Sequence, residues 1–267
     1  MYQEHFGLKA LPFGESAGLE GQVALPSRDA VLRRLRYALE HGRGPALLFG
    51  PSGAGKTLSA RRLASELGSQ TIHLPYPALP PNELLAYLAN ELEGTTRPLG
   101  PAATLRRLQT ALSAAVVRGD RPLLIVDEAH LIEEPGTFEA LRLLQNFATA
   151  GPPDLLLLLV GAPEILLRIP HSLADRLAAR CLLGPLSESE ASAYVLGRLA
   201  LAGAREPLFD AEQLSTLHRA ADGLPRRLNR LADLALLIAY AEGLPRPDAR
   251  CLAIARRDAL PDELAAC

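Results

Sequence analysis

Residues 50–57 have the sequence Gly-Pro-Ser-Gly-Ala-Gly-Lys-Thr, which fits the pattern G-x-x-x-x-G-K-[ST]. Glycines let the backbone wrap around phosphate oxygens, while successive N–H groups and a helix N-terminus supply partial positive charge. Lys56 would reach the β- and γ-phosphates of a nucleotide, and the Thr57 hydroxyl would be a ligand of Mg²⁺. These residue types at this spacing therefore predict the binding of ATP with Mg²⁺.

The surroundings of this loop match what the pattern needs. Ala46-Leu47-Leu48-Phe49 is a short apolar run typical of a buried strand, and residues 58–64 are typical of a helix. An ordinary glycine-rich turn is the alternative. The order strand, glycine loop, helix favours a phosphate site over that alternative.

A second motif, Leu-Leu-Ile-Val-Asp-Glu-Ala-His, occupies residues 123–130. Buried parallel strands are continuous apolar runs, and sites in open α/β sheets lie at the carboxyl ends of strands. We therefore expect Asp127 and Glu128 beside the phosphate loop. Asp127 would hold Mg²⁺, usually through water, and Glu128 would polarise the attacking water. A surface Asp-Glu pair at a strand end is the alternative. The residues predicted to hold the nucleotide are Gly50, Pro51, Ser52, Gly53, Ala54, Gly55, Lys56, Thr57, Leu58 and Asp127.

Bulk properties narrow the class of protein. The chain has 267 residues, is 48% hydrophobic and carries a net charge of −2, so it can bury a sizeable core but gives no bulk argument for nucleic acid or membrane. Three scattered cysteines show neither metal spacing nor a disulfide framework, which favours a reducing compartment. The N-terminus has no signal-peptide pattern and no apolar run is long enough to span a bilayer. We expect a cytoplasmic protein without a membrane segment.

Hydrophobic periodicity predicts alternating strands and helices over the first part of the chain. Expected strands lie at 46–49, 70–74, 122–127, 155–160 and 181–183. Expected helices lie at 27–40, 58–67, 83–92, 102–118, 137–149 and 164–169, with Asn82 as the cap of the third and a loop at 94–101.

From Ser187 onward the sequence predicts helices alone, at 187–202, 210–221, 225–242 and 247–256, with a capping-box spacing at 187–190. This change predicts an α/β domain followed by an all-helical domain. We expect an N-terminal arm at 1–27 whose apolar residues pack on the domain body, a nucleotide-binding domain at 28–184 and a helical lid domain at 185–267.

Arginines separate a simple phosphate-loop kinase from an oligomeric ATPase of the AAA+ type. A simple kinase would not need an all-helical tail with its own arginines. An oligomeric ATPase of the AAA+ type uses an arginine from a neighbouring subunit at the γ-phosphate and a second arginine from a helical lid. Arg176 and Arg180, spaced one helical turn apart before the last strand, are candidates for the first, and Arg226 at the start of a lid helix is a candidate for the second. Arginine suits this role because its planar fork pairs with phosphate oxygens. Salt bridges on solvated faces are the alternative.

Several motifs together resemble the ExeA/GspA family of bacterial AAA+ ATPases, which is similar to the initiator clade and to transposition ATPases of the TniB and TnsC type. They are residues 1–8 with Pro12-Phe13, the two motifs above, residues 160–164 and 185–187, and Gly-Leu-Pro-Arg-Arg-Leu-Asn at 223–229. The resemblance implies a three-layer α/β/α parallel sheet with a helical lid. It also implies catalytic roles for Lys56, Glu128, Arg180 as finger and Arg226 as second sensor, and a place near adenine for Arg28.

The chain departs from the family pattern at two points. Ala162 stands where members usually carry a polar first-sensor residue that orients the attacking water, which predicts slow hydrolysis or a water held by another residue such as His130. The sequence also ends at Cys267 without the transmembrane helix and peptidoglycan-binding part of the full-length secretion member. The letters Asp-Glu-Ala-His at 127–130 also suggest a DEAH helicase. We reject that class because the sequence contains one RecA-like core, which is too few for such a helicase.

Three functions stay open on the sequence alone. The first is an ATP-hydrolysing switch that assembles into a homo-oligomeric ring or filament with a partner protein complex. The second is a nucleotide-gated scaffold with little turnover, which Ala162 favours. The third is a DNA-binding ATP switch, in which Arg33, Arg34 and Arg36, or Arg106 and Arg107, would meet phosphates. An exposed helix face is the alternative for these arginines, and the sequence alone favours it.

Overall fold

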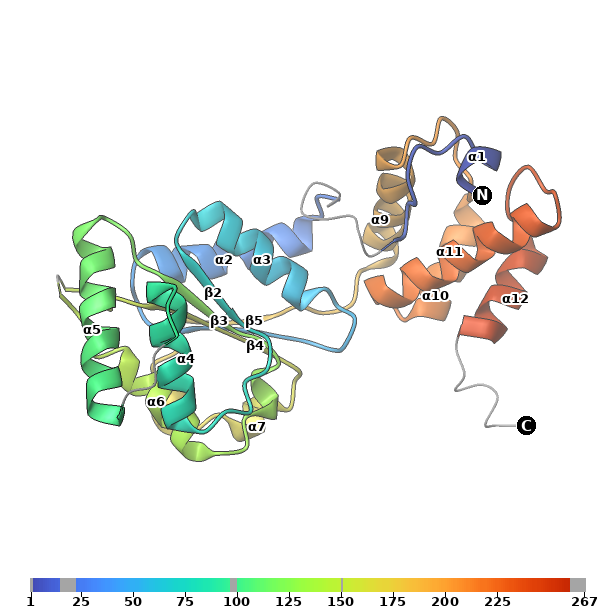
Figure 1. Cartoon of the computed structure of the whole chain (residues 1–267). Helices are drawn as coiled ribbons and strands as arrows, with labels where there is room; N and C mark the ends of the chain where they lie inside the picture. The colour runs from blue at the N-terminus through green and yellow to red at the C-terminus, as the bar shows by residue number, and fades with distance from the viewer. Residues whose placement is uncertain (1, 15–22, 97–99, 150, 260–267) are drawn as a thin grey trace. The chain divides into compact units, whose positions relative to one another are not determined.

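The structure is a computed structural model that describes residues 2–14, 23–96, 100–149 and 151–259 (Figure 1). Two compact units emerge, each with its own core. The α/β unit comprises residues 30–52 and 56–183, and the helical unit comprises the described parts of residues 1–29, 53–55 and 184–267. Met1, Cys267 and residues 97–99 of the expected loop lie outside the described residues.

The α/β unit is built on a five-stranded parallel sheet in the order β2-β3-β4-β1-β5. The strands are β1 (Ala46–Phe49), β2 (Thr71–Leu74), β3 (Leu123–Val126), β4 (Leu156–Gly161) and β5 (Ala179–Leu182). In this register Ala46 lies opposite both Leu158 and Ala179. Because all strands run in the same direction, the segments that follow β1, β3 and β4 all start at the carboxyl ends of the strands.

Helices cover both faces of the sheet (Figure 1). α2 (Pro26–Glu40) and α3 (Lys56–Leu67) lie on one face, and α4 (Pro81–Glu93), α5 (Pro101–Val117) and α6 (Pro135–Leu144) lie on the other. Side chains alternate between the faces, so that Leu124, Val126, Leu157 and Leu159 all join the core beneath α4–α6. Burial on both sides explains the continuous apolar runs of the sequence and confirms the predicted α/β class.

The helical unit contains α1 (Tyr2–His5), α9 (Glu188–Leu201), α10 (Ala211–Ala221), α11 (Pro225–Ala241) and α12 (Ala249–Ala259). Its core combines leucines and alanines of the last four helices with Phe209. The helices begin and end within a few residues of the periodic segments in the sequence. No described helix is long and apolar enough to cross a membrane.

The N-terminal segment packs on the helical unit, which corrects the expectation that it packs on the body of the nucleotide-binding domain. Tyr2, Leu8 and Phe13 are buried among the side chains of α9–α12. The Tyr2 hydroxyl donates to Asp233, and Arg198, only 7% exposed, donates to the carbonyl oxygens of Pro12 (2.7 Å) and Gly14 (3.3 Å). The positions of these polar partners were not visible in the local sequence pattern.

Helix caps differ from the expected ones in two places. α4 begins after Pro80, so the prediction of Asn82 as its cap is wrong, because consecutive prolines fix the first turn. Ser187 caps α9 by accepting from the Glu190 N–H at 3.2 Å, but the Glu190 carboxylate accepts from the Ser27 N–H instead of closing the box. A complete capping box joins Asp210 and Gln213 at the start of α10.

Candidate nucleotide-binding site

The glycine loop follows β1 and leads directly into α3. Gly53 and Gly55 have φ angles of 77° and 91°, in the left-handed region that favours glycine. Gly50 has a different requirement, since a Cβ there would lie 2.2 Å from the Leu183 carbonyl oxygen. The loop therefore needs glycine both for its backbone conformation and for its close approach to the chain after β5.

Lys56 is the first residue of α3 and is 8% exposed. Its Nζ donates to the Pro51 carbonyl oxygen at 3.1 Å, which holds the ammonium group against the loop. The first turn of α3 contains no acidic residue, so its N–H groups keep their positive field for an anion. Thr57 follows in the same turn, half-buried.

Asp127 lies just beyond β3 and is 5% exposed. Its Oδ1 accepts from the Glu128 N–H at 2.9 Å, and its Oδ2 lies 3.3 Å from His73 Nε2. His73, in β2, is a neighbour that the sequence analysis missed. Its one signal was a polar ring between two buried apolar residues, Ile72 and Leu74, of the edge strand. The register of the sheet places His73 opposite Ile125, two residues before Asp127.

Glu128 has a backbone conformation that few non-glycine residues adopt. Its φ is 48°, and only Asp222 shares a positive φ among the described non-glycine residues. Backbone strain of this kind tends to lie at functional sites. The Glu128 side chain is 45% exposed against 7% for Asp127, so one carboxylate is enclosed and the other is open to a substrate.

His130 connects this motif to the end of β4. It lies in the short helix η2 (Ala129–Leu131), and its Nδ1 accepts from the Ala162 N–H at 3.2 Å. The same nitrogen lies 3.5 Å from Glu128 Oε2. A ring nitrogen that accepts an N–H carries no proton, so the proton of a neutral ring is assigned to Nε2.

The residues present fit a magnesium nucleotide. A hydroxyl from Thr57 and an enclosed carboxylate from Asp127 are oxygen donors of the kind Mg²⁺ takes. Among the described residues no group of three or more His, Cys, Asp or Glu side chains could hold a metal ion. Mg²⁺ keeps several waters and is commonly held by one or two protein ligands together with substrate phosphates.

The arginines of the α/β unit lie differently from the prediction. Arg180 is inside β5 and Arg176 lies in the turn after α8 (His171–Ala174), so the two are not one helical turn apart. Arg180 Nη2 donates to the Ala174 carbonyl oxygen at 2.6 Å, and Arg176 Nη1 donates to Asn146 Oδ1 at 3.2 Å. Arg180 is exposed on β5, an edge strand of the sheet.

Arg226 lies in the first turn of α11 within the helical unit. Its N–H donates at 3.2 Å to the carbonyl oxygen of Gly53, a loop residue grouped with the same unit. Arg28, in the first turn of α2, donates to the Gly184 carbonyl oxygen at 2.8 Å. Burial lowers the pKa of Arg28, against the opposing charge of Glu190.

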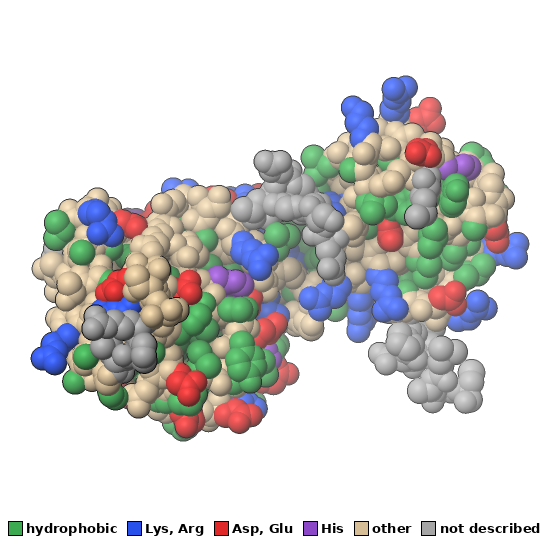
Figure 2. All heavy atoms as spheres, in the orientation of Figure 1, with side chains coloured by type: hydrophobic (Ala, Val, Ile, Leu, Met, Phe, Trp, Pro, Cys, Tyr) green, Lys and Arg blue, Asp and Glu red, His purple; other side chains and the backbone are tan. Residues whose placement is uncertain are grey.

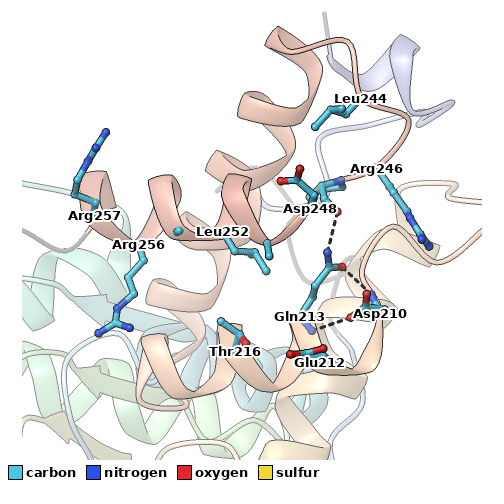
Figure 3. Close-up of a pocket in the computed structure, with 13 residues that line it drawn as sticks. Asp210, Glu212, Gln213, Thr216, Leu244, Arg246, Asp248, Leu252, Arg256 and Arg257 are labelled. Atoms are coloured by element: carbon cyan, nitrogen blue, oxygen red, sulfur yellow. Dashed lines mark hydrogen bonds between the residues drawn. The ribbon is translucent and has the colours of Figure 1, made fainter.

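A separate hollow of about 750 Å³ lies in the helical unit between α10, α12 and the turn that precedes α12 (Figure 3). Gln213 donates there to the Pro247 carbonyl oxygen at 2.8 Å and exchanges hydrogen bonds with Asp210. None of the residues predicted to bind or hydrolyse nucleotide lines it. Three of its polar residues begin helices: Asp210 and Gln213 cap α10, and Asp248 accepts from the Cys251 N–H at the start of α12.

Comparisons with known proteins show which sequences this chain resembles. Residues 39–169 match the AAA domain family model. The chain is 37% identical over 254 residues to the general secretion pathway protein A of Aeromonas hydrophila, covering 91% of this chain and 46% of that protein. The chain is GspA-like over 91% of its length and contains an AAA domain at residues 39–169. It spans about half the length of this curated relative, so the relative's whole activity does not transfer with the family.

Solved structures share the fold of this GspA-like chain at low sequence identity. CDC6P from Pyrobaculum aerophilum matches with a TM-score of 0.74 and 18% identity, over 93% of this chain and 70% of that one. The Aeropyrum pernix ORC1 protein in complex with DNA gives 0.67 and 19%, over 96% and 70%. The Thermotoga maritima RuvB Holliday junction branch migration motor gives 0.56 and 20%, over 85% and 67%.

Proposed function

We propose that the chain is a Mg²⁺-dependent ATP hydrolase that couples its nucleotide state to assembly with a partner complex. The observation that carries the proposal is the acidic pair after β3: an enclosed Asp127 and an open Glu128 with a left-handed backbone. Asp127 and Glu128 follow the carboxyl end of β3, on the same side of the sheet where the phosphate loop follows β1.

Each residue of the site has a proposed task. The loop from Gly50 to Leu58 binds the phosphates, with Lys56 at the β- and γ-phosphates. Thr57 and Asp127 hold Mg²⁺, which would neutralise developing negative charge when bound. Glu128 accepts a proton from the attacking water.

Two arginines complete the proposal. Arg180 acts on the nucleotide of a neighbouring subunit in a ring or filament, and Arg226 acts from the helical unit. Under this proposal residues 28–184 form the catalytic domain, residues 185–267 form the lid, and the protein works in the cytoplasm.

The rate of phosphate release per subunit, measured against protein concentration, tests this proposal. We expect the rate to rise with concentration, to vanish when Mg²⁺ is chelated, and to fall by about 10³-fold or more in Arg180→Ala, because fingers supplied in trans have effects of this size. A rate per subunit that is independent of concentration and unchanged in Arg180→Ala would exclude the finger.

A second function, a nucleotide-gated scaffold, is favoured by Ala162. Its methyl group cannot orient water, and its N–H is already bonded to His130. Tight ATP binding with no phosphate release at any concentration would establish this function in place of the first. The solved structures are less than 25% identical to this chain, so they show its fold alone. A DNA partner therefore has to be argued from the residues of this chain.

A further inference from the structure

A hollow of about 500 Å³ lies on the α/β unit, outside the nucleotide site. Its walls carry three arginines and one tyrosine, and the rest of its lining is alanine. We call it the arginine cleft; the side chains that define it are Arg33, Arg34, Tyr37 and Arg43, with Ala178 and Ala179 beside them.

The arginine cleft lies at the amino ends of β1 and β5. Arg43 stands three residues before β1, and Ala178 donates its N–H to the Pro45 carbonyl oxygen at 2.8 Å just before β5. The phosphate loop begins at the other end of β1. Four strand residues span roughly 13 Å, so a ligand in the cleft approaches from a different side than the nucleotide does.

The cleft has a single sign of charge. Arg33, Arg34 and Arg43 are exposed, no acidic side chain lines the hollow, and none of the three has a carboxylate within ion-pair distance among the residues described. On the same helix, Arg36 is neutralised by Glu40 at 2.7 Å. Three uncompensated arginines around one concavity concentrate positive potential there, in a chain whose net charge is −2.

Tyr37 organises the cleft. The Arg43 guanidinium lies over its ring at 5.3 Å from the centroid, and the His41 ring lies 4.2 Å away at an interplanar angle of 35°. These contacts occupy the tyrosine ring and hold the Arg43 guanidinium at the wall of the cleft. The cleft is therefore built to present guanidinium groups, which pair with phosphate oxygens through two N–H donors.

The hollow in the helical unit shows the contrast. It is larger, but Asp210, Glu212 and Asp248 line it together with three arginines (Figure 3). Acidic and basic side chains are also interspersed over the face of the molecule shown in Figure 2. Neither surface selects a ligand by the sign of its charge.

We propose that the arginine cleft binds the sugar-phosphate backbone of a nucleic acid. Phosphodiester oxygens match the arginine forks, and a backbone contact requires no hydrogen bonds from the alanine floor. An acidic peptide fits less well, because its backbone N–H and C=O groups would face alanine side chains that offer no hydrogen bonds. Binding of this kind is independent of base sequence and sensitive to salt.

This inference deepens the proposed function by naming a partner class, yet it is tested separately. DNA binding is measured without ATP hydrolysis. A loss of turnover would therefore not contradict the assignment of the arginine cleft, and a loss of DNA binding would not contradict the assignment of the nucleotide site.

The test is the affinity for a labelled short duplex DNA between about 50 and 200 mM salt. The variant is Arg33→Glu/Arg34→Glu/Arg43→Glu, with the neutral variant Arg33→Gln/Arg34→Gln/Arg43→Gln beside it. We expect affinity to fall about tenfold or more at low salt. The slope of log K against log salt should shrink by about 0.9 for each phosphate contact removed. Unchanged thermal unfolding and ATP affinity show that the variants are folded.

A matched control carries the same charge change elsewhere on the α/β unit. Arg61, Arg118 and Arg168 are exposed, and Arg61→Glu/Arg118→Glu/Arg168→Glu should keep most of the DNA affinity. Equal losses in both reversed variants would overturn the cleft assignment, because net charge alone would then explain them. Absence of DNA binding by the unaltered protein at about 50 mM salt, or binding of poly-glutamate in its place, would also overturn it.

Discussion

The two ends of the sheet in the α/β unit differ in chemistry. At the carboxyl ends, a glycine loop, Lys56 and the pair Asp127 and Glu128 combine cationic and acidic groups, as catalysis on a phosphate needs. At the amino ends, the arginine cleft presents positive charge alone. Under the two proposals, one end carries out a reaction and the other holds an anion without changing it.

The two ends also differ in how tightly the side chains are held. Lys56 and Asp127 are enclosed and hydrogen-bonded, and Glu128 has a left-handed backbone. The cleft arginines are exposed on a regular helix and the turn after it. Catalytic groups need fixed geometry, whereas binding a polyanion tolerates side chains that adjust. Variants at one end should therefore leave the function of the other unchanged.

Among the variants that compare the two ends of the sheet, the largest effect is expected at Lys56. Lys56→Ala removes the cation nearest the loop, and we expect the turnover number to fall by about 10²–10³-fold, as for the loss of one oriented donor. ATP affinity should fall by about tenfold or more, because hydrogen bonds to charged groups contribute about 1.5–3 kcal/mol. Phosphate release and titration with a fluorescent ATP analogue measure both. DNA affinity that falls together with ATP affinity would break the separation of the two ends.

A smaller effect separates strain from catalysis at Glu128. Glu128→Gly relieves a left-handed backbone that costs a non-glycine residue about 1–2 kcal/mol, partly offset by the extra freedom of glycine when unfolded. We expect a Tm about 2 °C higher, together with loss of turnover. Differential scanning calorimetry measures the first change.

Asp222→Gly is the matched control, since Asp222 ends α10 with a φ of 52°. It should raise Tm by a similar amount and keep turnover, because glycine is preferred at this position. A lower Tm for Glu128→Gly beside a higher one for Asp222→Gly would mean that the Glu128 backbone is not strained.

The smallest effect is expected at Tyr37. Tyr37→Ala removes the ring beneath Arg43, a contact whose exposed kind contributes about 0.5–1 kcal/mol. DNA affinity should fall about two- to fivefold while ATP affinity stays the same. Fluorescence anisotropy at low salt measures this, with Tyr76→Ala, an exposed tyrosine outside the cleft, as control. A loss of ATP affinity in Tyr37→Ala would connect the two ends.

The sequence predicts the carboxyl end of the sheet well, for a physical reason. A phosphate loop is contiguous, so that all its requirements lie within eight residues, and parallel strands buried on both faces are unbroken apolar runs. Both features can therefore be recognised from a single sequence. The AAA+ resemblance rested on the same contiguous motifs, and the comparisons confirm it.

Features that depend on contacts between distant residues escaped prediction. Arg180 has a helical spacing from Arg176, but pairing with β1 draws it into β5. The partners of His73 and of Arg198 lie 54 and 186 residues away in the chain. The arginine cleft joins α2 to the start of β5. Arg33 and Arg34 of the helix were candidates from the sequence, but Arg43 and the concavity could not be predicted from it.

Phosphate release by Glu128→Gln, beside the unaltered protein at saturating ATP and Mg²⁺, tests the central claim most directly. Glutamine keeps the shape of the side chain and removes the proton acceptor. We expect a rate lower by about 10²–10⁴-fold, with ATP affinity kept within a few-fold. Equal rates in the two proteins, with ATP bound by both, would contradict the assignment of Glu128 and with it the catalytic role of this end of the sheet.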